Sequence, residues 1–163
     1  MDNQVGLNVF YEGVSQLGIK LTPEIIEQFS LYYAELLTWK SKMNLIGYKH
    51  EKDIIGNLFI DSLAGGLILT SESQCVVLDI GSGAGFPGIP LKIVFPNIFM
   101  NLLEPNSKKV SFLHNVIGVL GLQGINVEST KIEKMVEKPG FNGFFDLIFM
   151  KGLRLDIALP YVR

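Results

Sequence analysis

Cysteine, histidine and charge of either sign are scarce in this chain of 163 residues. The single cysteine, Cys75, excludes an internal disulfide and argues against a metal site built from thiolates. His50 and His114 have no partner at the spacing of metal ligands, so we assign neither a metal site nor a role to them. Charged residues make up 18% of the chain and the net charge is −2, which excludes a strongly basic protein that coats nucleic acid. Any contact with RNA must then come from local patches.

Long apolar runs are also missing. Lys92 interrupts the best candidate, residues 89–95, and no stretch approaches the roughly 20 apolar residues of a membrane span. The first ten residues lack the basic start and apolar run of a signal peptide, so we expect a cytoplasmic protein with no membrane partner. Hydrophobic residues nevertheless make up 48% of the chain, enough to build a core and to exclude a disordered chain.

The first half of the chain has helical periodicity. Gly18 suits the end of a first helix. Thr22-Pro23-Glu24 predicts the start of a second helix, with Thr as the N-cap, Pro at the first helical position and an acidic residue in the first turn. A third helix is predicted over residues 51–69, although Gly65 and Gly66 weaken it.

From residue 74 onward, short β-branched runs alternate with helical stretches, which is typical of βαβ units. Right-handed crossovers place four parallel strands in the order 3-2-1-4, a Rossmann-like α/β sheet. The predicted strands are residues 75–80, 99–103, 125–128 and 145–149, and the predicted helices between them are residues 88–95 and 107–120.

A glycine-rich loop follows the first predicted strand. Asp79 lies in that strand, and Gly81, Gly83 and Gly85 alternate after it as G-x-G-x-G. This spacing differs from the G-x-G-x-x-G that seats a pyrophosphate, and the Lys-Ser/Thr of a P-loop is absent. Glycines let the backbone turn tightly and let a ligand approach closely. An acid in the strand suits a ligand without phosphates whose ammonium needs an acceptor, such as S-adenosylmethionine; the alternative is a turn without a ligand.

Polar residues follow the other predicted strands. Glu104, at the end of the second strand, is predicted to accept both ribose hydroxyls, the alternative being a solvated carboxylate. After the third strand, Ile132 is predicted to lie over the adenine, whereas Glu133 suits either the ligand or an exposed helix position. After the fourth strand, Lys151 and Arg154 suit the cofactor carboxylate, an RNA phosphate or simply the surface.

Two further groups of residues carry weaker signals. Lys108 and Lys109 open a predicted helix where cations are unfavourable for its dipole, which hints at another use. Tyr32, Tyr33 and Trp39 suit base stacking, but their helical spacing is more typical of a core.

Several of these segments together resemble one family, the bacterial small-subunit ribosomal RNA guanine-N7 methyltransferases, also called the glucose-inhibited division protein B family. The similarity runs from about Leu31 to Val162, and the Gly-Phe-Pro-Gly-Ile-Pro that continues the glycine loop is its most specific part. The matching segments are residues 37–45, 59–63, 78–91, 108–113 and 145–148.

The resemblance implies S-adenosylmethionine as methyl donor and guanine N7 of 16S ribosomal RNA as acceptor, with that RNA or the small ribosomal subunit as partner. Guanine N7 carries a lone pair and no proton at neutral pH, so we name no catalytic acid or base and expect positioning and desolvation to dominate. By position, the cofactor contacts of the family fall on Gly81, Phe86, Glu104, Ile132, Glu133 and Lys151.

The change from helical periodicity to alternating strands and helices divides the chain into an N-terminal helical segment packed on the core, residues 1–73, and a methyltransferase core, residues 74–163. We expect this core to be truncated at its C-terminus, which leaves the fourth strand as an apolar edge able to self-associate. Two alternatives stay open: a non-catalytic domain that binds S-adenosylmethionine or RNA, and a methyltransferase that acts on another substrate.

Overall fold

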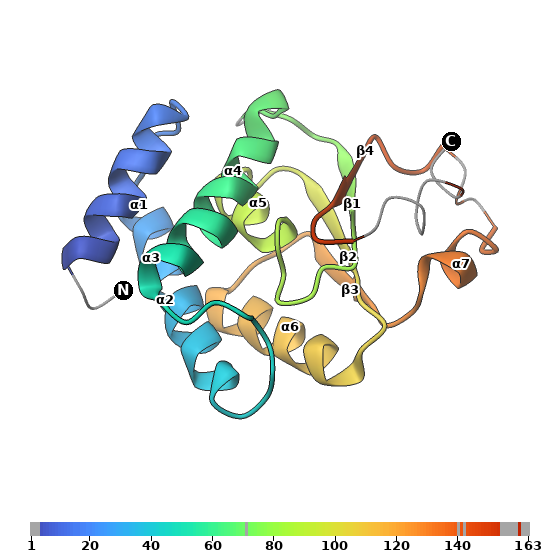
Figure 1. Ribbon diagram of the computed structural model, residues 1–163. Helices are drawn as coiled ribbons and strands as arrows, with labels where there is room; N and C mark the ends of the chain where they lie inside the picture. The colour runs from blue at the N-terminus through green and yellow to red at the C-terminus, as the bar shows by residue number, and fades with distance from the viewer. Residues whose placement is uncertain (1–3, 71, 140, 142, 154–159, 161–163) are drawn as a thin grey trace.

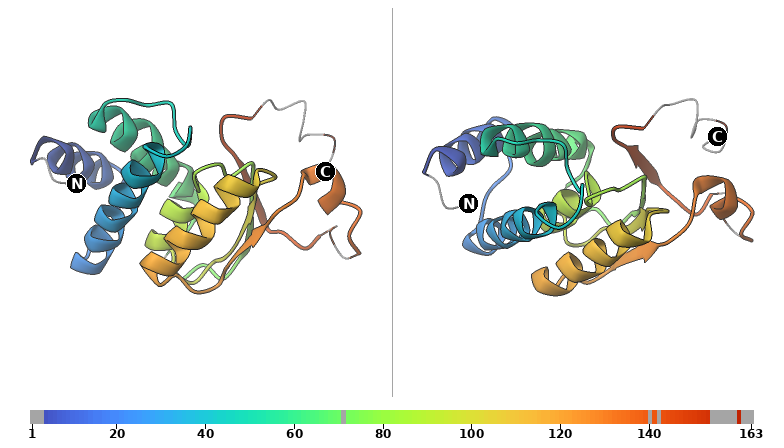
Figure 2. Two further views of the ribbon diagram at one scale, coloured as in Figure 1. Left: turned by 90° about the horizontal axis from the view of Figure 1, so that it is seen from below. Right: turned by 60° about the horizontal axis from the view of Figure 1, so that its bottom comes forward.

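The computed structural model describes residues 4–70, 72–139, 141, 143–153 and 160, which fold into helices packed around a parallel sheet (Figure 1). Helices α5 (Gly88–Val94) and α6 (Ser107–Leu120) cover one face of the sheet, and the short α7 (Ile132–Met135) lies on the other. Figure 2 shows the N-terminal helices α1 (Gln4–Gln16) and α2 (Pro23–Lys40) beyond α5 and α6, on the side away from α7.

The sheet has the predicted order and direction. Its strands are β1 (Val76–Ile80), β2 (Phe99–Leu103), β3 (Ile125–Glu128) and β4 (Leu147–Met150). They are parallel in the order β3-β2-β1-β4, which confirms the order 3-2-1-4. The last residues of the strands are in register, so all four carboxyl ends meet at one edge of the sheet.

The fourth strand begins two residues later than predicted. The carboxylate of Asp146 accepts a hydrogen bond from the Val76 N–H at 2.7 Å, so a side chain satisfies a donor at the start of the ladder. Phe145 packs instead against the rings of Phe141 and Phe144, with centroids 5.7 and 5.0 Å away. An apolar run alone cannot distinguish a strand residue from a loop residue in such a cluster.

Helix ends follow local sequence signals. The Thr22 hydroxyl accepts a hydrogen bond from the Ile25 N–H at 3.3 Å, which confirms the predicted cap of α2. Gly18 after α1 and Gly121 after α6 have φ angles of +70° and +63°, the left-handed conformation that ends many helices.

The predicted third helix is instead a continuous helical segment that changes its winding. It consists of α3 (Glu51–Ile54), the π-helical η1 (Ile55–Ile60), α4 (Asp61–Ala64) and the 3-10 turn η2 (Gly65–Ile68). A Cβ on Gly66 would lie 2.6 Å from the Leu91 side chain and 2.8 Å from that of Phe95. The missing side chain at Gly66 therefore lets this turn pack directly against α5.

One apolar core joins the N-terminal helices to the sheet. Rings from α1, α2 and η1 (Phe10, Phe29, Tyr32, Phe59) contact one another and continue to Phe86 and Phe112 on the sheet side. A second, smaller cluster around Leu78 and Ile132 lies between the sheet and α7. The division of the chain near residue 73 is therefore visible as a change in local structure, and its status as a domain boundary stays a prediction.

Among the described helices, none combines the length and the apolar character needed to cross a membrane.

Candidate cofactor-binding site

The glycine-rich loop folds back over the end of β2. The N–H groups of Gly81 and Ser82 both donate to the Leu103 carbonyl, at 2.8 and 3.1 Å. The Ser82 carbonyl then accepts from the Gly85 N–H at 2.7 Å, and α5 begins at Gly88. The loop thus joins the carboxyl ends of two neighbouring strands, the place where ligands bind in open α/β sheets.

The three alternating glycines have different roles. All have positive φ, of +72° at Gly81, +59° at Gly83 and +91° at Gly85. A Cβ on Gly81 would lie 2.4 Å from the Leu153 side chain, and one on Gly85 would lie 2.5 Å from that of Ile89. At Gly83 the nearest described atom would be 3.8 Å away. Gly81 and Gly85 are therefore required by packing, whereas Gly83 borders open space that a ligand can occupy.

Helix α2 supports the loop from behind. The fully buried hydroxyl of Tyr32 donates to the Ala84 carbonyl, and its ring stacks on Phe86 with centroids 5.3 Å apart. Trp39 packs edge-on against Phe112 at 5.6 Å, and Tyr33 is buried as well. These aromatic residues of α2 are core residues rather than a surface for bases, and Tyr32 positions the loop. No sequence signal pairs Tyr32 with Ala84, because 52 residues separate them.

Glu104 is held rigidly at the end of β2. Its carboxylate accepts hydrogen bonds from the Gly83 N–H at 2.9 Å and the Asn106 N–H at 2.8 Å. The residue is only 5% exposed, yet it lines the larger of the two hollows described below. A carboxylate has about four lone-pair sites, so these two bonds orient Glu104 and leave acceptor capacity for a ligand.

Asp79 points away from the ligand side of the loop. Its Oδ2 accepts from the Gly88 N–H at 3.0 Å, whereas Oδ1 has no partner among the described residues. Burial raises the pKa of this carboxyl from 3.8 to about 7. Its side chain lines neither hollow in the described structure, so the predicted contact with a ligand ammonium stays a prediction.

We expect Asp79→Asn to change how stability depends on pH. With a folded-state pKa near 7, the folded protein holds a proton over the range from about pH 4 to pH 7, where the unfolded chain releases it. The free energy of unfolding of the wild type should therefore fall as the pH rises through this range. Asparagine keeps an acceptor for Gly88 but does not titrate, so urea unfolding from pH 4 to pH 8 should show a flatter profile. Parallel profiles for the two proteins would contradict this assignment.

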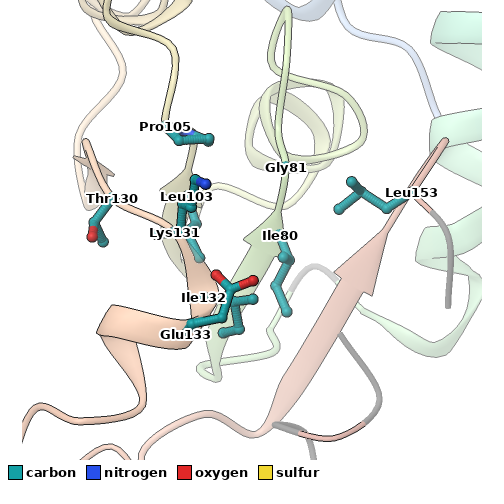
Figure 3. A pocket seen from close by; sticks show the side chains of 9 residues that line it. All are labelled: Ile80, Gly81, Leu103, Pro105, Thr130, Lys131, Ile132, Glu133 and Leu153. Atoms are coloured by element: carbon teal, nitrogen blue, oxygen red, sulfur yellow. The ribbon is translucent and has the colours of Figure 1, made fainter. Parts of the chain in front are cut away.

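Two adjoining hollows open at the carboxyl edge of the sheet and share Gly81, Pro105 and Leu153. The smaller, of about 290 Å³, is shown in Figure 3, where Ile132 and Glu133 on α7 face Ile80 of β1. The larger has a volume of about 600 Å³. Together they form one groove across the ends of β1, β2 and β4.

Most of the predicted site residues border this groove. Gly83, Phe86, Glu104 and Lys151 line the larger hollow, Ile132 and Glu133 line the smaller, and Gly81 lines both. Gly85 of the loop and Asp79 of β1 are not among the described lining residues of either hollow.

Lys151 links β4 to the N-terminal helices. Its ammonium donates to the Asn57 carbonyl at 2.5 Å and forms an ion pair with the Asp61 carboxylate. Arg154, the other predicted cation, lies outside the described residues. Among the residues that are described, no three His, Cys, Asp or Glu side chains gather in the manner of metal ligands.

One wall of the larger hollow was not predicted from the sequence. The loop between α2 and α3 contributes Leu45, Ile46 and Tyr48, and Lys109 of α6 joins them. Of these four, Lys109 carried a signal of its own, as a cation at an unfavourable helix position, and Leu45 only as the last residue of a segment that resembles the family. The loop residues reach the site through tertiary packing, which a local pattern does not reveal.

Comparisons with known proteins identify the family. The model of the family described as rRNA small subunit methyltransferase G matches residues 25–154. The ribosomal RNA small subunit methyltransferase G of Caldanaerobacter subterraneus is 39% identical to this chain, over 98% of the chain and 69% of the relative. The protein of the same name from Dictyoglomus thermophilum is 36% identical, over 95% of the chain and 67% of the relative. The chain thus spans about two thirds of the length of these relatives.

Solved structures share the fold at much lower sequence identity. A putative O-methyltransferase from Klebsiella pneumoniae superimposes with a TM-score of 0.59 at 17% identity, covering 92% of this chain and 64% of its own. A putative protein-L-isoaspartate O-methyltransferase from Plasmodium falciparum, solved with S-adenosyl-L-homocysteine, gives a TM-score of 0.53 at 15% identity, covering 93% of this chain and 77% of its own. The fold is that of these methyltransferases, and the sequence match is more specific: the chain belongs to the rRNA small subunit methyltransferase G family.

Proposed function

We propose that this protein transfers a methyl group from S-adenosylmethionine to N7 of a guanine in 16S ribosomal RNA. The observation that carries the proposal is the groove at the carboxyl ends of the strands, where open space at Gly83 adjoins the fixed carboxylate of Glu104. Membership of the family supplies the reaction and the class of substrate.

The groove fits the proposed cofactor. Ile80, Leu103 and Ile132 give the smaller hollow apolar walls, which suit an adenine ring. Glu104 lines the larger hollow next to Pro105, which both hollows share, and it suits the ribose hydroxyls because its orientation is already fixed. The total volume of the groove lies in the range of about 300–1,000 Å³ that is typical of small-molecule sites.

Other residues complete the proposed cofactor site. The methionine moiety would lie along Gly81 and Gly83, where a side chain at Gly83 would occupy its space. We assign Lys151 to its carboxylate and Glu133 to the rim of the adenine hollow. The other predicted site residues hold the glycine loop in place. Phe86 does so by stacking on Tyr32, Gly85 by its conformation, and Asp79 by its hydrogen bond from Gly88.

The residues of this chain would act by positioning. When bound, S-adenosylmethionine supplies a methyl group that is already activated on a sulfonium. Leu45, Leu58 and Leu153 line the larger hollow and would give the entering guanine base an apolar surface from which water is displaced. Because N7 has no proton to lose at neutral pH, no side chain has to act as a base. A water-poor hollow with fixed walls is what such a transfer requires.

The proposal extends to the surroundings of the enzyme. Because ribosomal RNA is the proposed substrate, we place the protein in the cytoplasm, acting on 16S RNA or on the small ribosomal subunit. β4 is at an edge of the described sheet, and an unpaired apolar edge favours pairing with a second copy, so self-association through β4 is part of the proposal.

Methyl transfer from labelled S-adenosylmethionine tests the function. We expect incorporation into 16S RNA, offered either free or as assembled small subunits, and recovery of the label as N7-methylguanosine after digestion to nucleosides. Incorporation at another atom, or into protein, would identify a different methyltransferase. Binding of S-adenosylmethionine by calorimetry without transfer to either form of the RNA would favour the non-catalytic alternative.

A further inference from the structure

We propose that Tyr48 is the surface on which the target guanine stacks, and that Lys109 binds a phosphate of the same RNA strand at the mouth of the larger hollow. The inference rests on the proposed function, because it concerns the part of the groove that the proposed cofactor leaves free. It assigns a substrate-binding role to two residues outside the cofactor site.

The walls of the larger hollow divide into two groups. One group consists of the glycine loop and Glu104, and the proposed cofactor would bind against these residues. The other is the loop between α2 and α3, with Leu58 behind it. The methyl acceptor must reach the cofactor from the open side of the hollow, so this second group is the wall that the base would contact.

Tyr48 differs from the two tyrosines of α2. Tyr32 is fully buried and Tyr33 is 6% exposed, whereas Tyr48 is 38% exposed and lines the hollow. Its backbone is anchored, because the Lys40 ammonium donates to the Tyr48 carbonyl. A tethered loop with an accessible ring at the entrance of a hollow is suited to stacking a nucleobase that has left its helix.

Lys109 provides a positive charge in the lining of the same hollow. It is half-buried, and among the described residues no carboxylate forms an ion pair with it. Its backbone is fixed at the start of α6, where the Asn106 side chain accepts from the N–H groups of Lys108 and Lys109 at 3.0 and 3.3 Å. A stacking ring and an unneutralised cation around one opening form the combination that holds an unpaired nucleotide. The overall charge of −2 makes such a local cation necessary.

Substitutions at Tyr48 test the inference, with full-length 16S RNA transcribed in vitro as the probe. With saturating S-adenosylmethionine, Tyr48→Ala should lower kcat/KM for the RNA by at least about fivefold, which is the lower end of what one stacked base contributes. Tyr48→Phe keeps the ring and should stay within about threefold of the wild type. Tyr11, which is 41% exposed on α1, supplies the matched control Tyr11→Ala, which should change nothing. Lys109→Ala should weaken RNA binding and reduce its salt dependence.

Two further measurements separate this inference from the proposed function. Calorimetry should show unchanged S-adenosylmethionine affinity in Tyr48→Ala; an equal loss of cofactor affinity would mean a structural role and overturn the inference. Equal kcat/KM in Tyr48→Ala and the wild type would also overturn it. If the wild type binds 16S RNA but transfers no methyl group, the proposed function fails, and weaker RNA binding by Tyr48→Ala would still support the stacking surface. If the wild type does not bind the RNA, the inference fails too.

Discussion

Gly83→Val should abolish binding of S-adenosylmethionine in a protein that remains folded. The Cβ at this position would enter open space beside the glycine loop, with no described atom closer than 3.8 Å. Two methyl groups on that Cβ would fill the part of the larger hollow assigned to the methionine moiety. We expect the affinity, measured by calorimetry, to fall by at least about a hundredfold, because a ligand cannot share the volume of a side chain.

The strain of a side chain at positive φ needs its own control. Gly83 has a φ of +59°, and a residue other than glycine there costs about 1–2 kcal/mol. Gly121 has a similar φ of +63°, at the end of α6, and a Cβ there would meet no atom within 4 Å, so it has at least as much space as at Gly83. Gly121→Val should therefore lose similar stability in urea but keep its cofactor affinity. If a folded Gly83→Val protein bound S-adenosylmethionine with wild-type affinity, the placement of the methionine moiety at this loop would be wrong.

The contrast between the glycines shows how far the sequence predicts the site. The G-x-G-x-G spacing located the loop, and the run of β-branched residues before it located β1 to within one residue. Both are local signals, because a strand and the turn that follows it are encoded by neighbouring residues. The strand order followed from the handedness of βαβ crossovers, which depends little on particular side chains.

What the spacing does not reveal is what lies opposite each residue. A Cβ on Gly81 would collide with Leu153 and one on Gly85 with Ile89, so packing requires glycine at these two positions. The G-x-G-x-G spacing, in contrast, predicted ligand contact for all three glycines. Asp79 shows the same limit, because the alternation of β1 turns its side chain toward α5 and Gly88. The wall at Tyr48 comes from a loop far from the sheet in sequence. Each of these facts depends on tertiary contacts that no window of sequence contains.

Glu104→Gln should weaken cofactor binding by about 1–3 kcal/mol, or roughly fivefold to 150-fold. The two carboxylate oxygens each accept one backbone N–H, from Gly83 and Asn106. The amide of glutamine has only one oxygen, so its NH₂ group must face one of these two donors. The substitution therefore removes the charge that would strengthen bonds to the ribose hydroxyls and also releases one contact that fixes the carboxylate.

Glu133→Gln is the control that separates the role of Glu104 from the general charge of the groove. Both are carboxylates that line the groove, but Glu104 is buried between the glycine loop and the start of α6, whereas Glu133 is half-exposed on α7. A water-screened charge contributes less, so Glu133→Gln should change the affinity by no more than about 1 kcal/mol. Calorimetric titration of both variants with S-adenosylmethionine decides between them. Equal effects would mean that the groove acts through its charge alone, and an unchanged affinity in Glu104→Gln would exclude Glu104 as the ribose-binding residue.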